Sequence, residues 1–567
     1  MIMDNNTPQL SPVIFRDQKK SITSAFKFDQ ATLGSNRIVL HGWATSNCRI
    51  EILSNGIKLP SKIKKSFRPD VAAALQKAEP SSGFGITIYA RTSLIKSREF
   101  QLCVHVSIDG NESTLIYPLD LYVDENASTP SSDLVDAVAG CIEVAGLCVP
   151  SGEVVVAGWS VATGDIQFGL ETDSGEVLDI DAAYRFHRQD VVDVHFAKFG
   201  VCNNSGFIAR VSLIENCSRI YLVTKFQDKV LRRLCEIEVS IVPNDPLLAA
   251  RWLSGLLSPN HELAKRLSQV DLPLIEFLTT RRCEEWNFLP VTHKNLGTQV
   301  VDPKVSIIVP LYRRSDFVEH QLIEFSRDPW LLQNSEIIYV IDDVNIFNSI
   351  NIEFDQLRQI YQVPFRWIWG SVNRGFSGAN NLGASIAHGN ILLFLNSDVI
   401  PSEPGWLKSM YQVLVENPEI GVVAPRLLFP DGSIQHAGMN FIFRDDLSIW
   451  VNHHPLLGSP PELDPNRFLT LVPAVTGACL AIRRFDFDRI GGWDTGYLIG
   501  DFEDSDLCFK IREISLEVGY LPLVQLTHLE RQSFRLFDHR DDFRNRVVML
   551  NALRHQRRWL ERLPDFN

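Results

Sequence analysis

The sequence has no run of roughly 18 to 20 apolar residues, the length that a helix needs to cross a bilayer. Its start, Met1-Ile2-Met3-Asp4, lacks the basic residues and apolar stretch of a secretory signal. The ten cysteines are scattered without a CxxC pair, which excludes a zinc framework and is typical of reduced thiols. A formal net charge of -13 argues against a nucleic-acid binder. We therefore expect a cytoplasmic protein that binds no nucleic acid.

Length and composition predict several globular domains. The 567 residues are too many for one core, and 45% hydrophobic with 22% charged residues is ordinary for a globular protein. We divide the chain into a flexible N-terminus (1–24), β module 1 (25–127), β module 2 (128–244), a helical connector (245–300) and a C-terminal α/β domain with a helical tail (301–567).

The two N-terminal modules repeat one series of motifs. The order and spacing of these motifs indicate an internal duplication, and short β-rich runs predict small antiparallel sandwiches, each with one short helix. The repeated Trp and Phe are either core residues, which we favour, or a sugar-stacking platform, and the Arg and Asp either pair or cap a turn. The motifs are Gly42-Trp43, Arg68-Pro69-Asp70-Val71 and Gly83-Phe84, then Gly158-Trp159, Arg188-Gln189-Asp190-Val191 and Gly206-Phe207.

The C-terminal half alternates between two kinds of apolar pattern. The connector carries helical spacing at 246–253 and 261–267, and no function follows from it. From residue 304, strand-like runs at 305–309, 336–341 and 391–395 alternate with helical ones. This alternation predicts a mostly parallel sheet covered by helices, in which ligands bind outside the carboxyl ends of the strands.

Polar residues follow these strands where a ligand is expected. A carboxylate after a buried strand is a ready ligand for a hard divalent cation, and glycines before a helix N-terminus let phosphate approach the backbone. Turns and helix caps use the same residue types. The polar clusters, however, follow successive strands in the order that a site for a metal and a diphosphate requires. The clusters are Pro310 with Tyr312, Asp342-Asp343, Asn373-Arg374-Gly375, Asn396-Ser397-Asp398, and Glu503-Asp504-Ser505-Asp506 with His528.

The ordered series resembles the family 2 glycosyltransferases of GT-A fold, especially their rhamnosyltransferase-like branch, over about residues 303–535. A single motif is weak, whereas the whole series is specific. The matching stretches are Val305-Ser306-Ile307-Ile308-Val309-Pro310, Asn373-Arg374-Gly375-Phe376, Leu395-Asn396-Ser397-Asp398, Pro430-Asp431-Gly432-Ser433-Ile434-Gln435-His436-Ala437-Gly438, Thr476-Gly477-Ala478-Cys479, Gly491-Gly492-Trp493-Asp494, Glu503-Asp504-Ser505-Asp506-Leu507-Cys508 and His528-Leu529-Glu530.

The resemblance implies an inverting, metal-dependent transfer of a sugar from a UDP- or dTDP-sugar to a hydroxyl of a glycan or lipid-linked glycan, in surface-polysaccharide or O-antigen synthesis. Asp504 would be the catalytic base, and Asp398 and His528 would bind magnesium or manganese. The stretch 473–478 would lie between donor and acceptor. The nucleotide-sugar would be held by Pro310, Tyr312, Asp342, Asn373, Gly375, Asn396 and Glu503.

The sequence departs from the family pattern at two places. Asn396 occupies the first position of the Asp-x-Asp motif, which leaves Asp398 as the main acidic ligand. Asp342-Asp343 is followed by Val344-Asn345 where the family usually has Gly-Ser or Asn-x-Ser. Two rival classes stay open. One is a glycan-binding scaffold with a degenerate transferase domain, and the other is a sugar nucleotidyltransferase that releases pyrophosphate.

The accessory regions also leave alternatives. The β modules suit acceptor binding, partner docking or formation of a homo-oligomer. The arginine-rich tail after Phe534 is either a surface helix packed on the domain through Val547, Leu550 and Leu553, which we favour, or a basic helix that docks peripherally on the inner face of the cell membrane.

Overall fold

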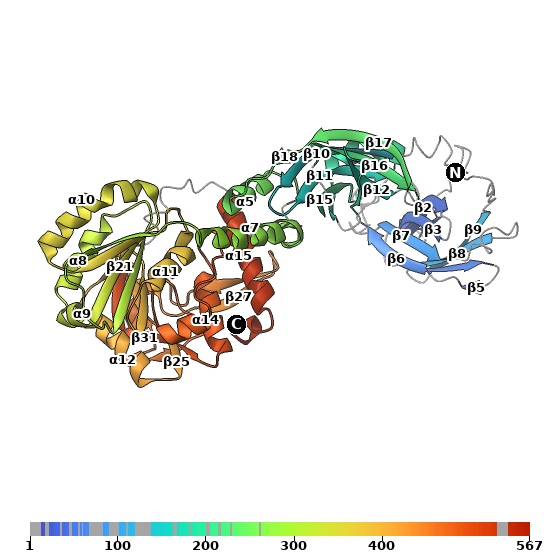
Figure 1. The fold of residues 1–567 in the computed structure, drawn as a ribbon. Coiled ribbons are helices and arrows are strands. Elements are labelled where there is room, and N and C mark those ends of the chain that lie inside the picture. The colour runs from blue at the N-terminus through green and yellow to red at the C-terminus, as the bar shows by residue number, and fades with distance from the viewer. Residues whose placement is uncertain are drawn as a thin grey trace. The chain divides into compact units, whose positions relative to one another are not determined.

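The computed structural model describes the chain in two parts (Figure 1). Between residues 13 and 118 it describes the backbone of the strands alone, so the signature at 68–71 and most of the predicted flexible N-terminus lie outside the described residues. From 138 to 566 it describes all residues except 163–166, 181–182, 200–203, 214–216, 227–228, 260–261 and 530–541.

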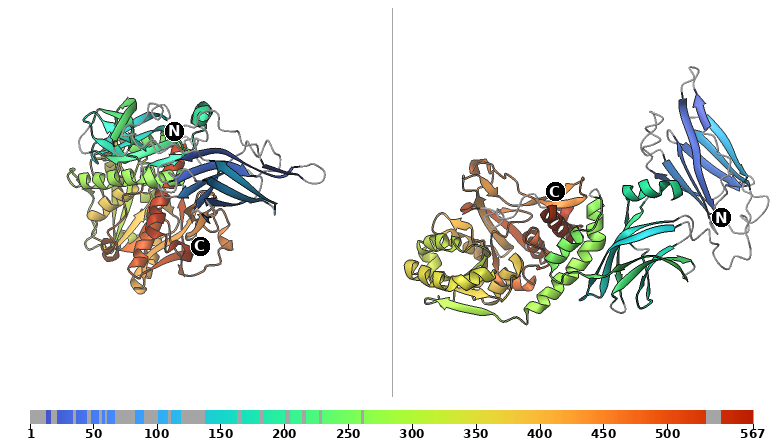
Figure 2. Two further views of the ribbon diagram at one scale, coloured as in Figure 1. Left: turned by 90° about the vertical axis from the view of Figure 1, so that its right-hand side faces the viewer. Right: turned by 90° about the horizontal axis from the view of Figure 1, so that it is seen from above.

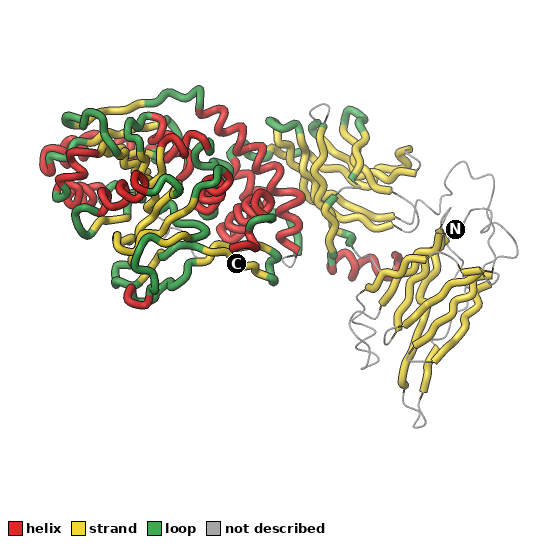
Figure 3. The backbone as a smooth tube through the Cα atoms, turned by 90° about the horizontal axis from the view of Figure 1, so that it is seen from below, coloured by secondary structure: helices red, strands yellow, loops and turns green. Residues whose placement is uncertain are grey.

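The two β modules are built of strands, drawn in yellow in Figure 3, and these strands follow one common order. The first described module has sheets β1-β2-β3-β7-β6 and β5-β4-β8-β9, and the second has β14-β15-β11-β10-β18 and β13-β12-β16-β17. Leaving aside β1 and β18, the strands correspond one to one, as an internal duplication predicts. The first module comprises β1 (Val13–Arg16), β2 (Ile22–Leu33), β3 (Arg37–Ala44), β4 (Cys48–Ser54), β5 (Ile57–Lys58), β6 (Ser61–Ser66), β7 (Gly83–Tyr89), β8 (Gln101–Ile108) and β9 (Asn111–Pro118).

In the second module the repeated motif residues are structural. Phe207 is fully buried, and Trp159 packs beside a small cluster that contains Val191. Arg188 donates to Asp190 and to Glu143, each at 2.8 Å from one of its nitrogens. The core and pairing interpretations are therefore confirmed here. The elements are β10 (Val138–Cys148), β11 (Glu153–Ala162), β12 (Gln167–Thr172), β13 (Val177–Asp179), β14 (Tyr184–Phe186), α4 (Gln189–Phe199), β15 (Gly206–Ser212), β16 (Arg219–Phe226), β17 (Lys229–Glu238) and β18 (Ser240–Ile241).

The stretch predicted as a connector belongs to the same compact unit as the C-terminal domain. Its strand β19 (Thr292–Leu296) pairs antiparallel with β22 (Phe365–Trp369) at the edge of the large sheet. Asp245 caps the first connector helix, because its carboxylate accepts from the backbone N–H of Leu247 and Leu248. The connector helices are α5 (Pro246–Ser254), α6 (Leu263–Arg266), the π-helix η2 (Leu267–Asp271) and α7 (Leu272–Trp286).

The large sheet is mixed, which corrects the prediction of a mostly parallel one. Strands β22, β21, β20 and β23 are mutually parallel, but β23 pairs antiparallel with β30, and β30 with β25. The order is β19-β22-β21-β20-β23-β30-β25-β31-β24. Its further strands are β20 (Val305–Leu311), β21 (Ser335–Ile341), β23 (Ile391–Leu395), β24 (Val399–Pro401), β25 (Ile420–Leu428), β26 (Ile434–His436), β29 (Thr470–Leu471), β30 (Cys479–Arg483) and β31 (Glu517–His528), while β27 (Asn440–Arg444) pairs with β28 (Ile449–His453).

Helices cover both faces of this sheet (Figures 1 and 2). Successive strand residues point to opposite faces, so Ile307 and Leu393 belong to one apolar core and Ile308 and Leu392 to the other. No helix among the described residues is long and apolar enough to cross a membrane. The helices are α8 (Phe317–Ser326), α9 (Pro329–Asn334), α10 (Val344–Tyr361) and α12 (Trp406–Glu416) on the first face, α11 (Gly375–Ser385), α13 (Arg484–Arg489), α14 (Glu503–Glu513) and α15 (Asp542–Trp559) on the second, and the short η3 (Pro461–Leu463) and η4 (Leu563–Phe566).

Candidate active site

The carboxyl ends of β20 and β21 bring the first two predicted clusters together. Pro310 pairs with Val340 in the parallel register, and the backbone N–H of Asp342 donates to Leu311 O at 2.9 Å. Tyr312 follows directly and is 39% exposed, so its ring is available to a ligand. Pro310, Tyr312 and Asp342 therefore lie at one edge of the sheet, as predicted.

The side chain of Asp342 holds the loop that begins α11. Its two carboxylate oxygens accept from the backbone N–H of Arg374 at 2.7 Å and of Gly375 at 3.0 Å, and from the side-chain amide of Asn373 at 3.0 Å. Burial raises the pKa of Asp342 to about 8, although these N–H donors act in the opposite direction. Asp343 instead caps α10 by accepting from Asn345 N at 2.8 Å. The structure thus groups Asp342, Asn373 and Gly375.

The two glycines of this loop have different surroundings. Gly375 has φ +69°, and a side chain there would meet nothing within 4 Å, so its backbone faces open space as a ligand loop requires. A side chain at Gly378 would instead lie 2.8 Å from the ring of Trp286. The space beside Gly378 is therefore already filled by Trp286 of the connector helix α7 and by the Cβ of Arg374, which a side chain would meet at 2.7 Å. Arg374 also donates to Trp286 O, at 3.3 Å.

Asp398 and His528 face each other from β24 and β31. Asp398 Oδ1 lies 3.2 Å from His528 Nε2, and His528 Nδ1 lies 2.7 Å from Gln435 Oε1. An amide oxygen only accepts, so Nδ1 donates its proton to Gln435 and Nε2 is the ring nitrogen that faces the carboxylate. With its Nε2 lone pair free, His528 and the Asp398 carboxylate would converge on a divalent cation between them. A hydrogen-bond partner on the other ring nitrogen of a metal-binding histidine is usual.

The protein supplies few ligands to this position. The described residues contain no group of three or more His, Cys, Asp or Glu side chains that could hold a metal. Two protein ligands suit a cation whose remaining coordination comes from diphosphate and water, which is how Mg²⁺ is usually bound. Arg314 lies near enough that the Asp398 charge, after that of its closer partner Asp316, contributes to raising the pKa of its guanidinium.

Asp504 lies at the start of α14 with its carboxylate held by two backbone groups. Oδ1 accepts from Ser505 N at 2.8 Å and Oδ2 from Gly477 N at 3.2 Å. Burial raises its pKa to about 6, with Asp501 adding to the rise and the two N–H donors opposing it. A carboxylate with this pKa is ionised at neutral pH and is a better proton acceptor than an ordinary aspartate.

Glu503 has a more extreme environment than Asp504. It is buried, one of its carboxylate oxygens has no hydrogen-bond partner among the described residues, and burial together with the charges of Asp504 and Asp501 raises its pKa well above the usual range. This shift favours the protonated form of Glu503, and a protonated carboxyl donates a hydrogen bond, which suits the hydroxyl of a sugar better than a phosphate.

Hydrogen bonds connect the cation pair to Asp504. His436 Nε2 accepts from Thr476 N at 3.4 Å, and Ala478 O accepts from Asn396 N at 2.8 Å. Gln435, the partner of His528, precedes His436, and Asn396 lies two residues before Asp398. The loop 476–478 therefore contacts both the segment that carries the partner of His528 and the segment that carries Asp398. Its Gly477 also lies against Phe376 and Trp493, where a side chain would meet them at 3.2 and 3.1 Å. The clusters around Asp342, Asp398, Asp504 and His528 therefore meet around one loop.

The sequence alone does not reveal four of the residues in this network. Gln435 and His436 stand inside a motif that the sequence offers, but neither carries a predicted role. Trp286 falls in the stretch to which no function was assigned, and Asn551, described below, is one polar residue in an arginine-rich helix. The alternation of side chains along β26 is the signal for the first two, because it sends Gln435 and His436 to opposite sides.

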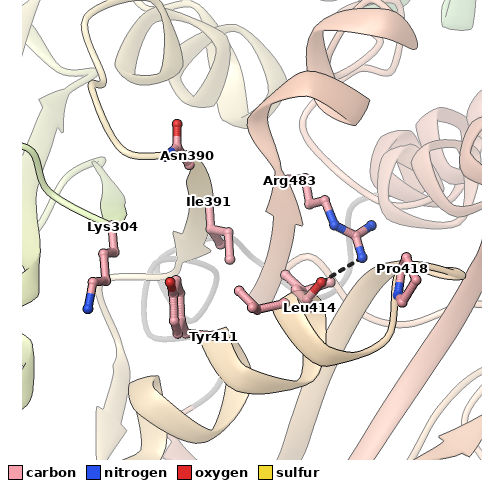
Figure 4. A pocket seen from close by; sticks show the side chains of 8 residues that line it. Lys304, Asn390, Ile391, Tyr411, Leu414, Pro418 and Arg483 are labelled. Carbon is pink, nitrogen blue, oxygen red and sulfur yellow. Dashed lines mark hydrogen bonds between the residues drawn. The ribbon is translucent and has the colours of Figure 1, made fainter.

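A separate cavity of about 260 Å³ lies at the amino ends of β20 and β23, opposite to the ends that carry the candidate site (Figure 4). Its residues Lys304 and Asn390 come just before β20 and β23, whereas the predicted site residues follow those strands. Arg483 at its rim is occupied, because its guanidinium donates to Leu414 O at 2.6 Å and to Ile420 O. This cavity does not belong to the candidate active site.

Comparison with known proteins finds a family model that matches part of the chain. Residues 306–491 match the model described as glycosyl transferase family 2, so this stretch is similar to that family. The match ends before Asp504 and His528, so these two residues of the site lie outside the part that the family model covers.

Curated relatives match less than half of the chain. The O-antigen biosynthesis protein RfbC of Myxococcus xanthus is 30% identical over 41% of this chain and 18% of its own length. The protein y4gI of Sinorhizobium fredii is 30% identical over 43% of this chain and 26% of its own. The chain thus spans about a quarter or less of these relatives. The solved structure of GalNAc-T7 with UDP, GalNAc and Mn²⁺ has a TM-score of 0.36 and 15% identity, over 46% of this chain and 49% of that one.

Proposed function

We propose that this chain is an inverting, metal-dependent glycosyltransferase that moves a sugar from a UDP- or dTDP-sugar to a hydroxyl of a glycan or lipid-linked glycan. The observation that carries the proposal is the meeting of a cation pair, Asp398 with His528, and a poised base, Asp504, around the loop 476–478. The family match supports sugar transfer as the reaction class.

Each group has a task that follows from its surroundings. Asp398 and His528 would hold Mg²⁺ or Mn²⁺, which when bound neutralises the charge that develops on the departing diphosphate. Asp504 takes the proton of the acceptor hydroxyl as that oxygen attacks the anomeric carbon. One displacement with a base on the acceptor side inverts the anomeric configuration, through a transition state of oxocarbenium character. Glu503, which is buried and whose protonated form is favoured by its surroundings, would donate to a sugar hydroxyl.

The nucleotide would lie against the edge formed by Pro310, Tyr312 and Asp342. The first turn of α11 begins there, and the N-terminus of a helix favours phosphate. Because Asp342 already accepts three hydrogen bonds from this loop, its first contribution is to hold the loop in shape for the nucleotide.

The setting is proposed from a relative. RfbC is named for O-antigen biosynthesis, which supports a role in surface-polysaccharide synthesis at the cytoplasmic side of the membrane. The β modules would bind acceptor, dock a partner or form a homo-oligomer. The tail helix α15 is packed, since Val547, Leu550 and Leu553 are buried, and Arg554 and Arg557 pair with Glu276.

A panel of UDP- and dTDP-sugars tests the proposal on the full chain. The correct donor with Mn²⁺ should raise the melting temperature, because a ligand at about 100 times its Kd stabilises by roughly 2.7 kcal/mol. Turnover should release a nucleoside diphosphate. The variant Asp398→Asn should lose the metal-dependent shift, and Asp488→Asn, at an exposed acid on α13, should keep it.

Two results would refute this function. An equal shift for Asp398→Asn and the unaltered chain would show that Asp398 does not hold the metal. Release of pyrophosphate would identify a nucleotidyltransferase instead, and binding of glycan without any turnover of a donor would identify a scaffold.

A further inference from the structure

The loop that leads into the base has an unusual backbone. Ile499, Asp501 and Phe502 have φ values of 66°, 78° and 76°, a left-handed conformation that residues with a side chain rarely adopt. Gly500 between them has φ 156°. Phe502 is the residue before Glu503, the first residue of α14, so this loop fixes where the helix and its Asp504 begin. Such strain persists only where the surroundings hold it in place.

One side chain makes most of the contacts that hold this loop. Asn551 of α15 accepts from Leu498 N at 3.1 Å through Oδ1. Its amide nitrogen donates to Leu498 O at 3.0 Å, to Gly500 O at 2.8 Å and to Asp501 O at 3.3 Å. Asn551 is only 2% exposed, so water does not compete for these bonds. A single amide thus satisfies one donor and three acceptors of the strained backbone.

Neighbouring residues on α15 extend the same contact. Arg554 donates to both carboxylate oxygens of Asp494, at 3.1 and 2.9 Å, and Trp559 Nε1 donates to Asp506 Oδ1 at 2.9 Å. The ring of His555 lies 5.5 Å from that of Phe502. Positions 551, 554, 555 and 559 recur at helical spacing, so one face of α15 carries these contacts. This face lies along the segment 494–506.

We propose that Asn551 is a positioning residue for catalysis, which locks the strained loop 498–502 and thereby aims the carboxylate of Asp504. The inference rests on the proposed function, because it assumes that Asp504 takes the proton of the acceptor. Asn551 itself touches no reacting atom. Its role explains why an arginine-rich tail helix is packed against the domain so close to the acidic motif.

The test compares two substitutions of Asn551 with a matched control. Asn551→Ala removes all four hydrogen bonds. Asn551→Asp keeps the size and the acceptor for Leu498 N, but it turns an oxygen toward the carbonyls of Gly500 and Asp501. Asn545→Ala makes the Asn-to-Ala change on the same helix at an exposed position. Each variant is measured in the full chain with the donor found above.

Two readouts separate positioning from folding. Both Asn551 variants should lower kcat about tenfold or more while the KM for the nucleotide-sugar stays within about twofold, since the donor side is not displaced. Hydrogen exchange of a peptide covering 494–506 should become faster in both, while the peptides of β20 and β23 stay protected. Asn545→Ala should match the unaltered chain in each measurement.

Three results would overturn the inference. Retention of kcat by Asn551→Ala would show that the loop needs no lock, and activity in Asn551→Asp would show that only the volume of the side chain matters. Loss of kcat in proportion to a general loss of protection would show a role in folding alone. If no nucleotide-sugar is turned over by the unaltered chain, the proposed function fails, whereas the exchange rate of the 494–506 peptide still reports whether Asn551 holds the loop.

Discussion

Replacement of Asp504 by Asn should stop sugar transfer. At neutral pH it should also remove an unfavourable buried charge, and this gain offsets part of the stability that a substitution at a buried site normally loses. In the folded protein burial raises the pKa of this carboxyl from an ordinary 3.8 to about 6. At ~1.4 kcal/mol per pH unit, this rise corresponds to about 3 kcal/mol by which the charged form weakens the folded state above pH 6. An amide of the same size carries no charge and escapes this cost.

The sign and the pH window follow from the direction of the pKa. Between its unfolded and folded pKa values the carboxyl binds a proton in the folded state and releases it on unfolding, so its contribution to stability falls as pH rises. Asparagine does not titrate. The difference in unfolding free energy between Asp504→Asn and the unaltered chain should therefore move in favour of the variant by about 1 kcal/mol between pH 5 and pH 7.

Hydrogen bonds set a constant offset to this difference. The carboxylate accepts from both Ser505 N and Gly477 N, and an amide offers a single oxygen, so one N–H loses its acceptor at a cost of about 1–3 kcal/mol at any pH. The comparison between two pH values removes this offset. The same substitution also removes one of the charges that raise the pKa of Glu503, which strengthens the trend with the same sign.

Melting curves at pH 5, 6 and 7 measure the stability, and donor turnover measures the activity. The unaltered enzyme should lose activity below about pH 6, tenfold for each further pH unit, as its base becomes protonated. If the variant is destabilised by the same amount at every pH, burial does not raise the pKa of Asp504. Retained turnover in Asp504→Asn would remove its assignment as base.

Two further predictions concern residues that hold the site. Gln435→Leu removes the oxygen that accepts from His528 Nδ1 and should weaken Mn²⁺ binding by about 10- to 100-fold in titration calorimetry; unchanged affinity would contradict the assigned tautomer. Gly378→Ala places a methyl group 2.8 Å from the Trp286 ring and should destabilise the unit by about 1–3 kcal/mol in thermal melting. Adding Trp286→Leu should recover part of that loss, and no recovery would locate the strain elsewhere.

The sequence predicts the position of polar residues that directly follow a buried strand. A buried apolar run that stops at Asp342 or at Asn396-Ser397-Asp398 identifies both the strand and the edge where its polar tip lies. The structure joins Asp342 to Asn373 and Gly375, and Asp398 to His528, as the order of the motifs predicts. These assignments succeed because local pattern and tertiary position agree at these residues.

The mixed half of the sheet could not be predicted in the same way. The apolar runs of β30 and β25 are as continuous as those of the other buried strands, since both are covered on both faces. Strand direction depends on how the chain returns to the sheet, and no local pattern records that. β25 and β31 again pair parallel, but β30 lies between β23 and β25 and runs antiparallel to both, and the sequence carries no signal for that reversal.

Contacts between distant segments leave still less trace in the sequence. Trp286 packs over Gly378, and Asn551 holds the loop before Asp504, yet in each pair neither residue stands in a pattern that points to the other. A glycine near the start of a helix gives the same sequence signal whether a ligand or an indole ring occupies the space beside it, as Trp286 does at Gly378. Asn551 is a polar residue in an arginine-rich helix, which in the sequence is indistinguishable from an exposed residue, and only the structure shows that it is buried.

The family match and the compact unit of the fold consequently begin and end at different residues. The match covers 306–491, but the loop 373–375, proposed to face the nucleotide, rests on Trp286 before that range. The proposed base and the proposed second cation ligand, Asp504 and His528, follow it, and Asn551 lies later still. A fragment cut at the limits of the match would expose Gly378 and Arg374 and lack three residues for which a role is proposed. What folds as one unit, and what chemistry requires, is therefore the segment from the connector helices through α15.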